Sequence, residues 1–216
     1  MVKKEEKDLI EFKRKIRKLN TYSKIQDFIN SIPVNFEEDG KDSCMSPLSV
    51  LEKNKCHCIE GAFLAASIIW LNKLGRPLVI DLRGEKWDWD HVIAVFQDKK
   101  TRKYGCISKT NHAVLRYREP VYYSIHELVM SYFHEYTDDK RKGIKTLREY
   151  SDPIDISLFG KDWIISKQDL WEIHDFLDKI KHNKILTKER RSARNYIMVI
   201  GGRDQADRLL PEKEAN

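Results

Sequence analysis

A cysteine and a histidine occupy positions at which a fold could bring a nucleophile and its base together. Cys58 stands at the start of an apolar segment that predicts a helix, and His91 opens a β-prone stretch 33 residues later. Only a small fraction of a free thiol is ionised at neutral pH, so a nucleophilic cysteine needs a neighbouring base. The positive end of a helix dipole and its unpaired N–H groups also favour the thiolate. If the strand packs against the helix, the pattern predicts a Cys58–His91 catalytic pair.

A catalytic imidazole also needs a third group that orients it. The next predicted strand ends in Ser-Lys-Thr-Asn-His at 108–112, so Asn111 or Ser108 is expected to orient His91. Asp90 is less suitable, because adjacent residues of a strand point to opposite faces. The alternative interpretation is that Cys58 is a small core residue and that His91 is a hydrogen-bonded residue at the end of a strand.

The elements that would position these residues follow from the hydrophobic pattern. Residues 59–74 are apolar on nearly all sides of a predicted helix, which is typical of a buried central helix, and Gly75 and Pro77 are stop signals. Short turns between the strands that follow indicate antiparallel neighbours. These strands are predicted over 78–82, 91–96 and 103–108.

Helical patterns flank this core on both sides. Ser23 with Gln26, and Ser124 with Glu127, form capping-box patterns at predicted helix starts. Further helices are predicted over 5–19, over 47–53, from a cap at Ser166 and Asp169 to Ile180, and over 187–200, while 137–160 reads as polar turns. We expect one domain over 1–210, with a helical part (1–44), a catalytic-type core (45–123), a second helical part (124–210) and a disordered tail (211–216).

The segment from 45 to 112 resembles the transglutaminase-like superfamily, and within it an uncharacterised prokaryotic branch. The resemblance lies in Cys-Ile-Glu-Gly-Ala at 58–62, the long apolar helix after it, and Asp-His-Val-Ile-Ala-Val at 90–95. It implies an α+β fold with a papain-like core, in which Cys58 is the nucleophile, His91 is the general base and acid, and Glu60 supports the helix start. The usual third residue of that family is an aspartate, whereas the matching window here holds Ser108, with Asn111 three residues further on.

Composition describes an ordinary charged protein. The 216 residues are 41% hydrophobic and 34% charged, with a net charge of +6 and an isoelectric point near 9.0. Residues 181–194 hold six basic residues against one acidic residue, and solvated helix faces are favoured there over a nucleic-acid partner. The longest apolar run is far shorter than the roughly 20 residues that cross a bilayer, and no signal peptide is evident. Four cysteines are too few for a disulfide scaffold, so a cytoplasmic location without membrane partners is expected.

Other residue clusters carry weaker signals. Cys56, His57 and Cys58 are too close together for a favourable zinc site, and their spacing is not that of a redox pair. Arg116 and Arg118 are expected to pair with acidic side chains rather than to clamp an anion. Two tryptophans before His91 suit either the wall of a cleft or a loop anchor.

The sequence therefore predicts a cysteine-dependent acyl transferase, or a hydrolase of amides or esters, that acts through a Cys58 thioester and uses no cofactor and no metal. Its expected partner is a peptide or a small amide or ester substrate. Two alternatives stay open: a catalytically inactive binding module of the same fold, favoured by the missing aspartate, and a nucleic-acid-associated basic protein. The acyl acceptor and the oligomeric state are not specified by the sequence.

Overall fold

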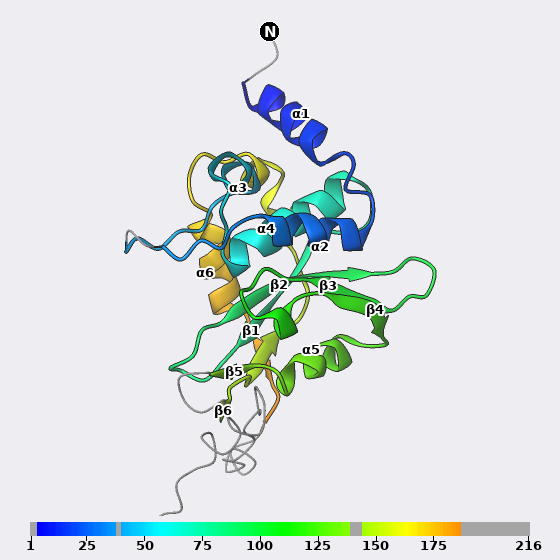
Figure 1. The fold of residues 1–216 in the computed structure, drawn as a ribbon, viewed down its shortest axis with the longest axis vertical. Helices are drawn as coiled ribbons and strands as arrows, with labels where there is room; N and C mark the ends of the chain where they lie inside the picture. The colour runs from blue at the N-terminus through cyan, green and yellow to red at the C-terminus, as the bar shows by residue number, and fades with distance from the viewer. Residues whose placement is uncertain (1–3, 38–39, 139–143, 187–216) are drawn as a thin grey trace, which may run out of the picture.

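Helix α4 (Cys58–Leu71) runs through the middle of the protein and packs against strand β2 (His91–Gln97). The computed structural model describes residues 4–37, 40–138 and 144–186. The fold is of the mixed α+β class, with an antiparallel sheet between two groups of helices (Figure 1). Every residue of α4 from Ile59 to Ile69 is buried, because its side chains other than Glu60 are apolar or small all round the helix.

The main sheet has the strand order β4-β3-β2-β1-β7-β9, and β8 also pairs with β1. All of its pairings are antiparallel, and the register places Leu82 opposite His91 and Ala94 opposite Ile107. Its strands are β1 (Leu78–Arg83), β2, β3 (Tyr104–Ile107), β4 (Arg118–Tyr122), β7 (Glu149–Ser151), β8 (Ile154–Asp155) and β9 (His182–Lys184). A separate hairpin consists of β5 (Thr137–Asp138) and β6 (Ile144–Lys145).

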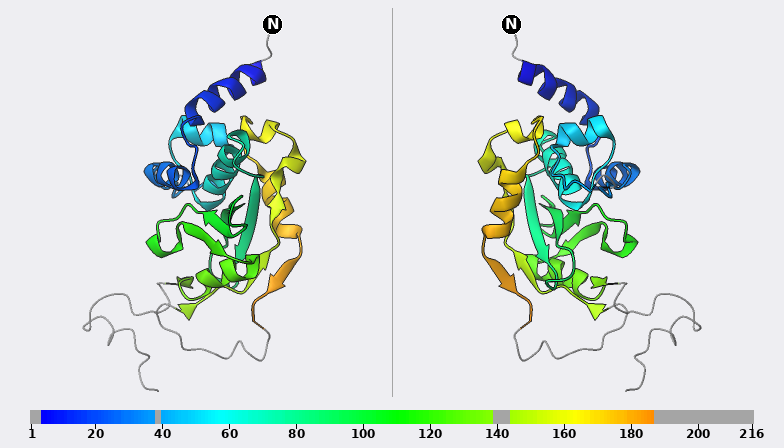
Figure 2. Two further views of the ribbon diagram at one scale, coloured as in Figure 1. Left: turned by 90° about the vertical axis from the view of Figure 1, so that its right-hand side faces the viewer. Right: turned by 90° about the vertical axis from the view of Figure 1, so that its left-hand side faces the viewer.

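Alternation along β2 divides the core between the two faces of the sheet. Val92, Ala94 and Phe96 pack in the larger hydrophobic cluster with α4, while Ile93 and Val95 pack in a smaller cluster with the helix α5. The helices are α1 (Lys4–Ile16), α2 (Tyr22–Ser31), α3 (Pro47–Lys53), α4, α5 (Ile125–Phe133) and α6 (Trp171–Lys179). Side views show α6, in orange, on the side of the molecule away from α2, in blue (Figure 2).

The three strands that the sequence predicts after α4 are confirmed, as is their antiparallel order. The segment 137–160, expected to be polar turns, instead contains four short strands, and β7 and β8 extend the sheet beyond β1. Strands of two or three residues are too short to show a period of two. Here β7 and β8 pair with the edge of β1, whereas β5 and β6 pair with each other. Helix α4 ends at Leu71, earlier than the predicted end at Leu74, and Lys73 just after it adopts the left-handed conformation.

Two predicted helix caps are wrong. Helix α2 is capped by Thr21, whose Oγ1 accepts from the Lys24 N–H, because Gln26 turns into the core instead of capping the helix. Helix α6 begins only at Trp171 and has no side-chain cap, because the Ser166 hydroxyl bonds locally to Gln168. The predicted cap at Ser124 is confirmed by the bond that its hydroxyl accepts from the Glu127 N–H. The expected helix over 187–200, most of the basic segment and the tail lie outside the described residues.

Within the described part of the chain, no helix combines the length and apolar character that a bilayer crossing requires. The buried face of α4 is instead covered by protein. Phe63, for example, is fully buried and meets Trp163 edge-on at 6.2 Å between ring centroids.

Replacing Phe63 by alanine should therefore destabilise the protein. Removing a buried aromatic side chain loses its contacts and leaves a cavity, and we expect Phe63→Ala to lower the free energy of unfolding by about 3–5 kcal/mol. Urea denaturation followed by circular dichroism measures the change. Ile10→Ala is the control, because Ile10 is 58% exposed on α1 and its loss should cost less than about 0.5 kcal/mol. Equal losses in the two variants would contradict a core built around α4.

Candidate active site

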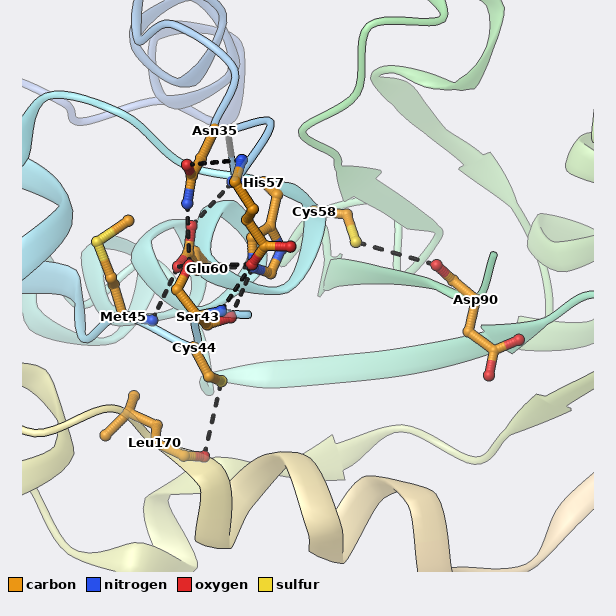
Figure 3. Close-up of polar contacts among 10 residues, drawn as sticks. Asn35, Ser43, Cys44, Met45, His57, Cys58, Glu60, Asp90 and Leu170 are labelled. Carbon is orange, nitrogen blue, oxygen red and sulfur yellow. Dashed lines mark hydrogen bonds and ion pairs between the residues drawn. The ribbon is translucent and has the colours of Figure 1, made fainter. Parts of the chain in front are cut away.

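Cys58 is the first residue of α4 and is partly exposed. His57 precedes it as the extended N-cap residue, and Cys56 forms a bridge with Val34 that anchors the chain just before the helix. The thiol points toward the start of β2, where its Sγ lies 4.0 Å from the backbone oxygen of Asp90 (Figure 3). The Cys58 sulfur therefore lies at the positive end of the α4 dipole and close to the start of β2.

The start of α4 is held by a buried carboxylate. Glu60 is fully buried and accepts hydrogen bonds from the His57 N–H at 2.9 Å, from the Met45 N–H at 2.9 Å and from the Ser43 hydroxyl at 2.8 Å. Figure 3 shows these contacts converging on Glu60 beneath His57. Three donors compensate a charge that would otherwise be costly to bury. Glu60 thus joins the segment before α3 to the first turn of α4.

His91 is the first residue of β2 and is only 6% exposed. Its Nε2 lies 2.7 Å from the Ser108 hydroxyl oxygen, and its ring packs edge-on against Tyr136. Because Nε2 is engaged by Ser108, Nδ1 is the ring nitrogen left for the thiol of Cys58. The candidate nucleophile Cys58 is thus on α4, the imidazole of His91 is on β2, and the orienting hydroxyl of Ser108 directly follows β3.

Asn111, the first choice for the orienting residue, does not occupy that position. It is exposed and lies at the edge of the site, whereas fully buried Ser108 makes the contact with His91 Nε2. Ser108 directly follows β3, so the sheet sets its position; Asn111 lies beyond the strand, in the turn that leads to the 3-10 helix over Ala113–Leu115.

Gln26 is a residue that the sequence analysis missed at this site. Its Oε1 accepts from the Ser108 N–H and its Nε2 donates to the Ser108 carbonyl oxygen, both at 2.9 Å. Gln26 is 4% exposed and comes from α2, far from Ser108 in the chain. No local pattern predicts this contact; the one available signal is a polar residue on the apolar face of α2, next to buried Ile25 and Ile29.

The electrostatic environment favours the thiolate of Cys58. Burial by itself raises the pKa of the thiol, but hydrogen bonds from the side chains of His57 and His91, together with their charge, outweigh burial and lower the pKa to about 5. Burial raises the pKa of the other three cysteines, Cys44, Cys56 and Cys106, above the usual value. Cys58 thus differs from the other three cysteines in two ways: its pKa is lowered, and its side chain is partly exposed.

Two hollows meet at Cys58. One has a volume of about 270 Å³ and extends past His91 and Asn111; the other, of about 650 Å³, extends toward Trp171 of α6. Cys58, His57 and Trp89 line both hollows, and Trp89 is 87% exposed. A substrate laid across the sulfur would find a surface on each side of it.

The other predicted candidates have structural roles. Arg118 pairs with Glu135 at 2.7 Å and lies over the Tyr132 ring, as expected of an arginine that covers apolar surface. Within the described residues, no three histidine, cysteine or acidic side chains come together in a way that would hold a metal ion.

The chain matches no protein-family model, and no curated protein matches its sequence. The chemistry of the site itself is therefore the basis on which we infer a function.

The cysteine chemistry predicts a selective reaction. With a pKa near 5, Cys58 should react with iodoacetamide at a nearly constant rate from about pH 6 upward and at half that rate near pH 5. The rate falls below that pH because the thiol, and not the thiolate, then predominates. Intact-mass and peptide mass spectrometry measure which cysteine is modified. A profile centred near the ordinary thiol pKa of about 8.5, or equal labelling of the four cysteines, would contradict this description of the site.

Proposed function

We propose that this protein is a cysteine-dependent acyl transferase or hydrolase that forms a thioester at Cys58. The observation that carries the proposal is the alignment of a partly exposed sulfur at a helix start with His91, whose Nε2 is held 2.7 Å from the Ser108 hydroxyl. A papain-like, transglutaminase-type core is part of the proposal. Its support is the order of a buried helix that begins with the cysteine, followed by an antiparallel strand that begins with the histidine.

The proposed reaction has two steps. The Cys58 thiolate attacks the carbonyl carbon of an amide, ester or thioester, and a C–S bond forms while the carbonyl oxygen becomes an oxyanion. Backbone N–H groups at the start of α4 would receive that oxyanion. The intermediate collapses as the bond to the leaving group breaks, and the imidazolium of His91 donates its proton to that group.

In the second step, neutral His91 removes a proton from water or from an amine as this acceptor attacks the thioester. The C–S bond breaks, the acyl group leaves on the acceptor, and Cys58 returns as thiolate beside protonated His91. The two hollows that Cys58 lines support a place for the acyl group and a place for the leaving group or acceptor. The expected cytoplasmic location is also part of the proposal, and four free cysteines support it.

The alternative is a binding module that keeps the fold without turnover. It is favoured by one feature, the serine at the position where the resembled family has an aspartate, because a hydroxyl supports an imidazolium less than a carboxylate does. A nucleic-acid function has no comparable support in the described residues, since most of the basic segment lies outside them.

Acylation of the protein by an activated ester tests the two functions against each other. On incubation with p-nitrophenyl acetate, we expect one acetyl group to accumulate on Cys58 and to be released by added amine or, more slowly, by water. His91→Gln should slow the acylation by about 100-fold or more, because proton transfer is lost. Cys58→Ala is the control and should form no adduct. An unacylated wild-type Cys58 would favour the binding module.

Ser108 and Asn111 form a matched pair for identifying the orienting residue. Ser108→Ala removes the hydroxyl from His91 Nε2, and we expect the acylation rate to fall about tenfold, the equivalent of one hydrogen bond. Asn111→Ala should stay within about twofold of the wild type. The same acetylation assay measures both variants. A large loss in Asn111→Ala with none in Ser108→Ala would reverse the assignment.

A further inference from the structure

We propose that His57 is a second imidazole acting on the Cys58 sulfur, and that it supplies a standing positive charge while His91 moves the proton. This inference rests on the proposed function of Cys58 and assigns to the same site a residue that the resemblance does not.

The ring of His57 is fixed in orientation. Its Nε2 donates to the backbone oxygen of Ser43 at 2.7 Å, which requires a proton on that nitrogen (Figure 3). Nδ1 is therefore the ring nitrogen left for the neighbouring thiol of Cys58, with which His57 lines both hollows. A proton on both ring nitrogens at once makes the imidazole a cation, and this is the form that both contacts favour.

Two carboxylates stabilise that cation. The nearest oxygens of Glu60 and Glu37 lie 3.5 and 3.6 Å from His57 Nε2. Both are themselves held by hydrogen bonds: Glu60 by its three donors, and Glu37 by the Ser43 N–H at 2.6 Å. Burial lowers the pKa of His57, but the bond to Cys58 and the charge of Glu60 outweigh it and raise the pKa to about 9.

The other titratable groups around the two hollows add to this field. The carboxylates are Asp42, Asp81, Asp88, Asp90 and Asp178. The basic groups are His91, His112, His174 and Lys109, and the Lys109 ammonium is turned inward to the carbonyl oxygens of Ile29 and Ile32. Carboxylates thus outnumber basic groups around the two hollows, and Glu60 and Glu37 are the carboxylates that form ion pairs with His57.

The two histidines thus differ in their partners. His91 faces the neutral hydroxyl of Ser108, whereas His57 faces two carboxylates. In the resembled family, a carboxylate supports the histidine that acts as the base. In this protein the two carboxylates instead lie beside the other histidine, His57. A histidine backed by two carboxylates retains its proton, and one backed by a hydroxyl exchanges its proton more readily. Nothing is bonded or released at His57 during the reaction; it lowers the energy of the sulfur anion.

The test is the pH profile of Cys58 alkylation by iodoacetamide in the full-length chain. His57→Gln keeps an N–H donor for the Ser43 oxygen but cannot become a cation. We expect its alkylation at pH 5 to be about fivefold slower than that of the wild type, with equal rates near pH 9, because the thiol pKa rises by about one unit. His91→Gln should shift the profile in the same direction and should also lose acylation by p-nitrophenyl acetate.

Two further variants keep the test decisive. Glu37→Gln leaves an acceptor for Ser43 but removes one carboxylate, and it should slow alkylation at pH 5 by up to about twofold. His174→Gln is the matched control, because His174 lines the same larger hollow but pairs with Asp175 and Asp178, and its profile should match the wild type. Circular dichroism confirms that each variant is folded; if His57→Gln is not, the Glu37→Gln profile decides.

The outcomes separate the two proposals. If the profiles of His57→Gln and Glu37→Gln superimpose on that of the wild type while His91→Gln is shifted and inactive, the role of His57 is overturned and the Cys58–His91 pair stands. If neither histidine variant shifts the profile and the wild type is not acylated, both proposals fail.

Discussion

The buried carboxylate of Glu60 is the constraint on which the site depends. An isolated charge in a protein interior is strongly unfavourable, so Glu60 is stable only where its donors surround it. Those donors come from the His57 backbone and from Met45 and Ser43, which lie on the segment before α3. The same contacts fix the first turn of α4, the direction of the Cys58 thiol and the position of the His57 ring. Loss of one donor would leave a buried charge partly unsatisfied, so the arrangement is cooperative.

The second half of the site, His91 and Ser108, comes from the sheet. His91 and Ser108 are brought together because β2 and β3 are adjacent antiparallel strands, and Gln26 from α2 holds the peptide of Ser108 from the other side. The sulfur is thus placed between two rigid bodies, a buried helix and a sheet. Groups held in this way need little reorganisation when charge develops. The exposed surface of Trp89 and the two hollows leave the approach to the sulfur open.

The distribution of charge differs from what the serine beside His91 suggests. Considered alone, a serine beside His91 points to a weakened or inactive site. The structure places two carboxylates next to the neighbouring His57, so the sulfur remains in an environment that favours its anion. The requirement is a stabilised thiolate, and more than one arrangement of imidazoles and carboxylates meets it.

The sequence alone was sufficient to predict the central helix, the three strands after it and their antiparallel order, because each of these depends on local hydrophobic pattern and short turns. It also predicted that Cys58 begins the helix and that His91 begins a strand, since both lie where the pattern changes. The sequence did not predict the short strands of 137–160 or the start of α6, because two- or three-residue strands and uncapped helix ends carry little local signal.

Only the tertiary structure decided between Ser108 and Asn111, and only it brought Gln26 and Glu37 into the site. In the sequence, Ser108 lies 82 positions from Gln26 and 17 positions from His91. Contacts at such separations are set by how the helix packs on the sheet and by the direction in which each side chain leaves its element. Sequence spacing does not contain that information, so the choice of residues at the centre of the site is a property of the fold.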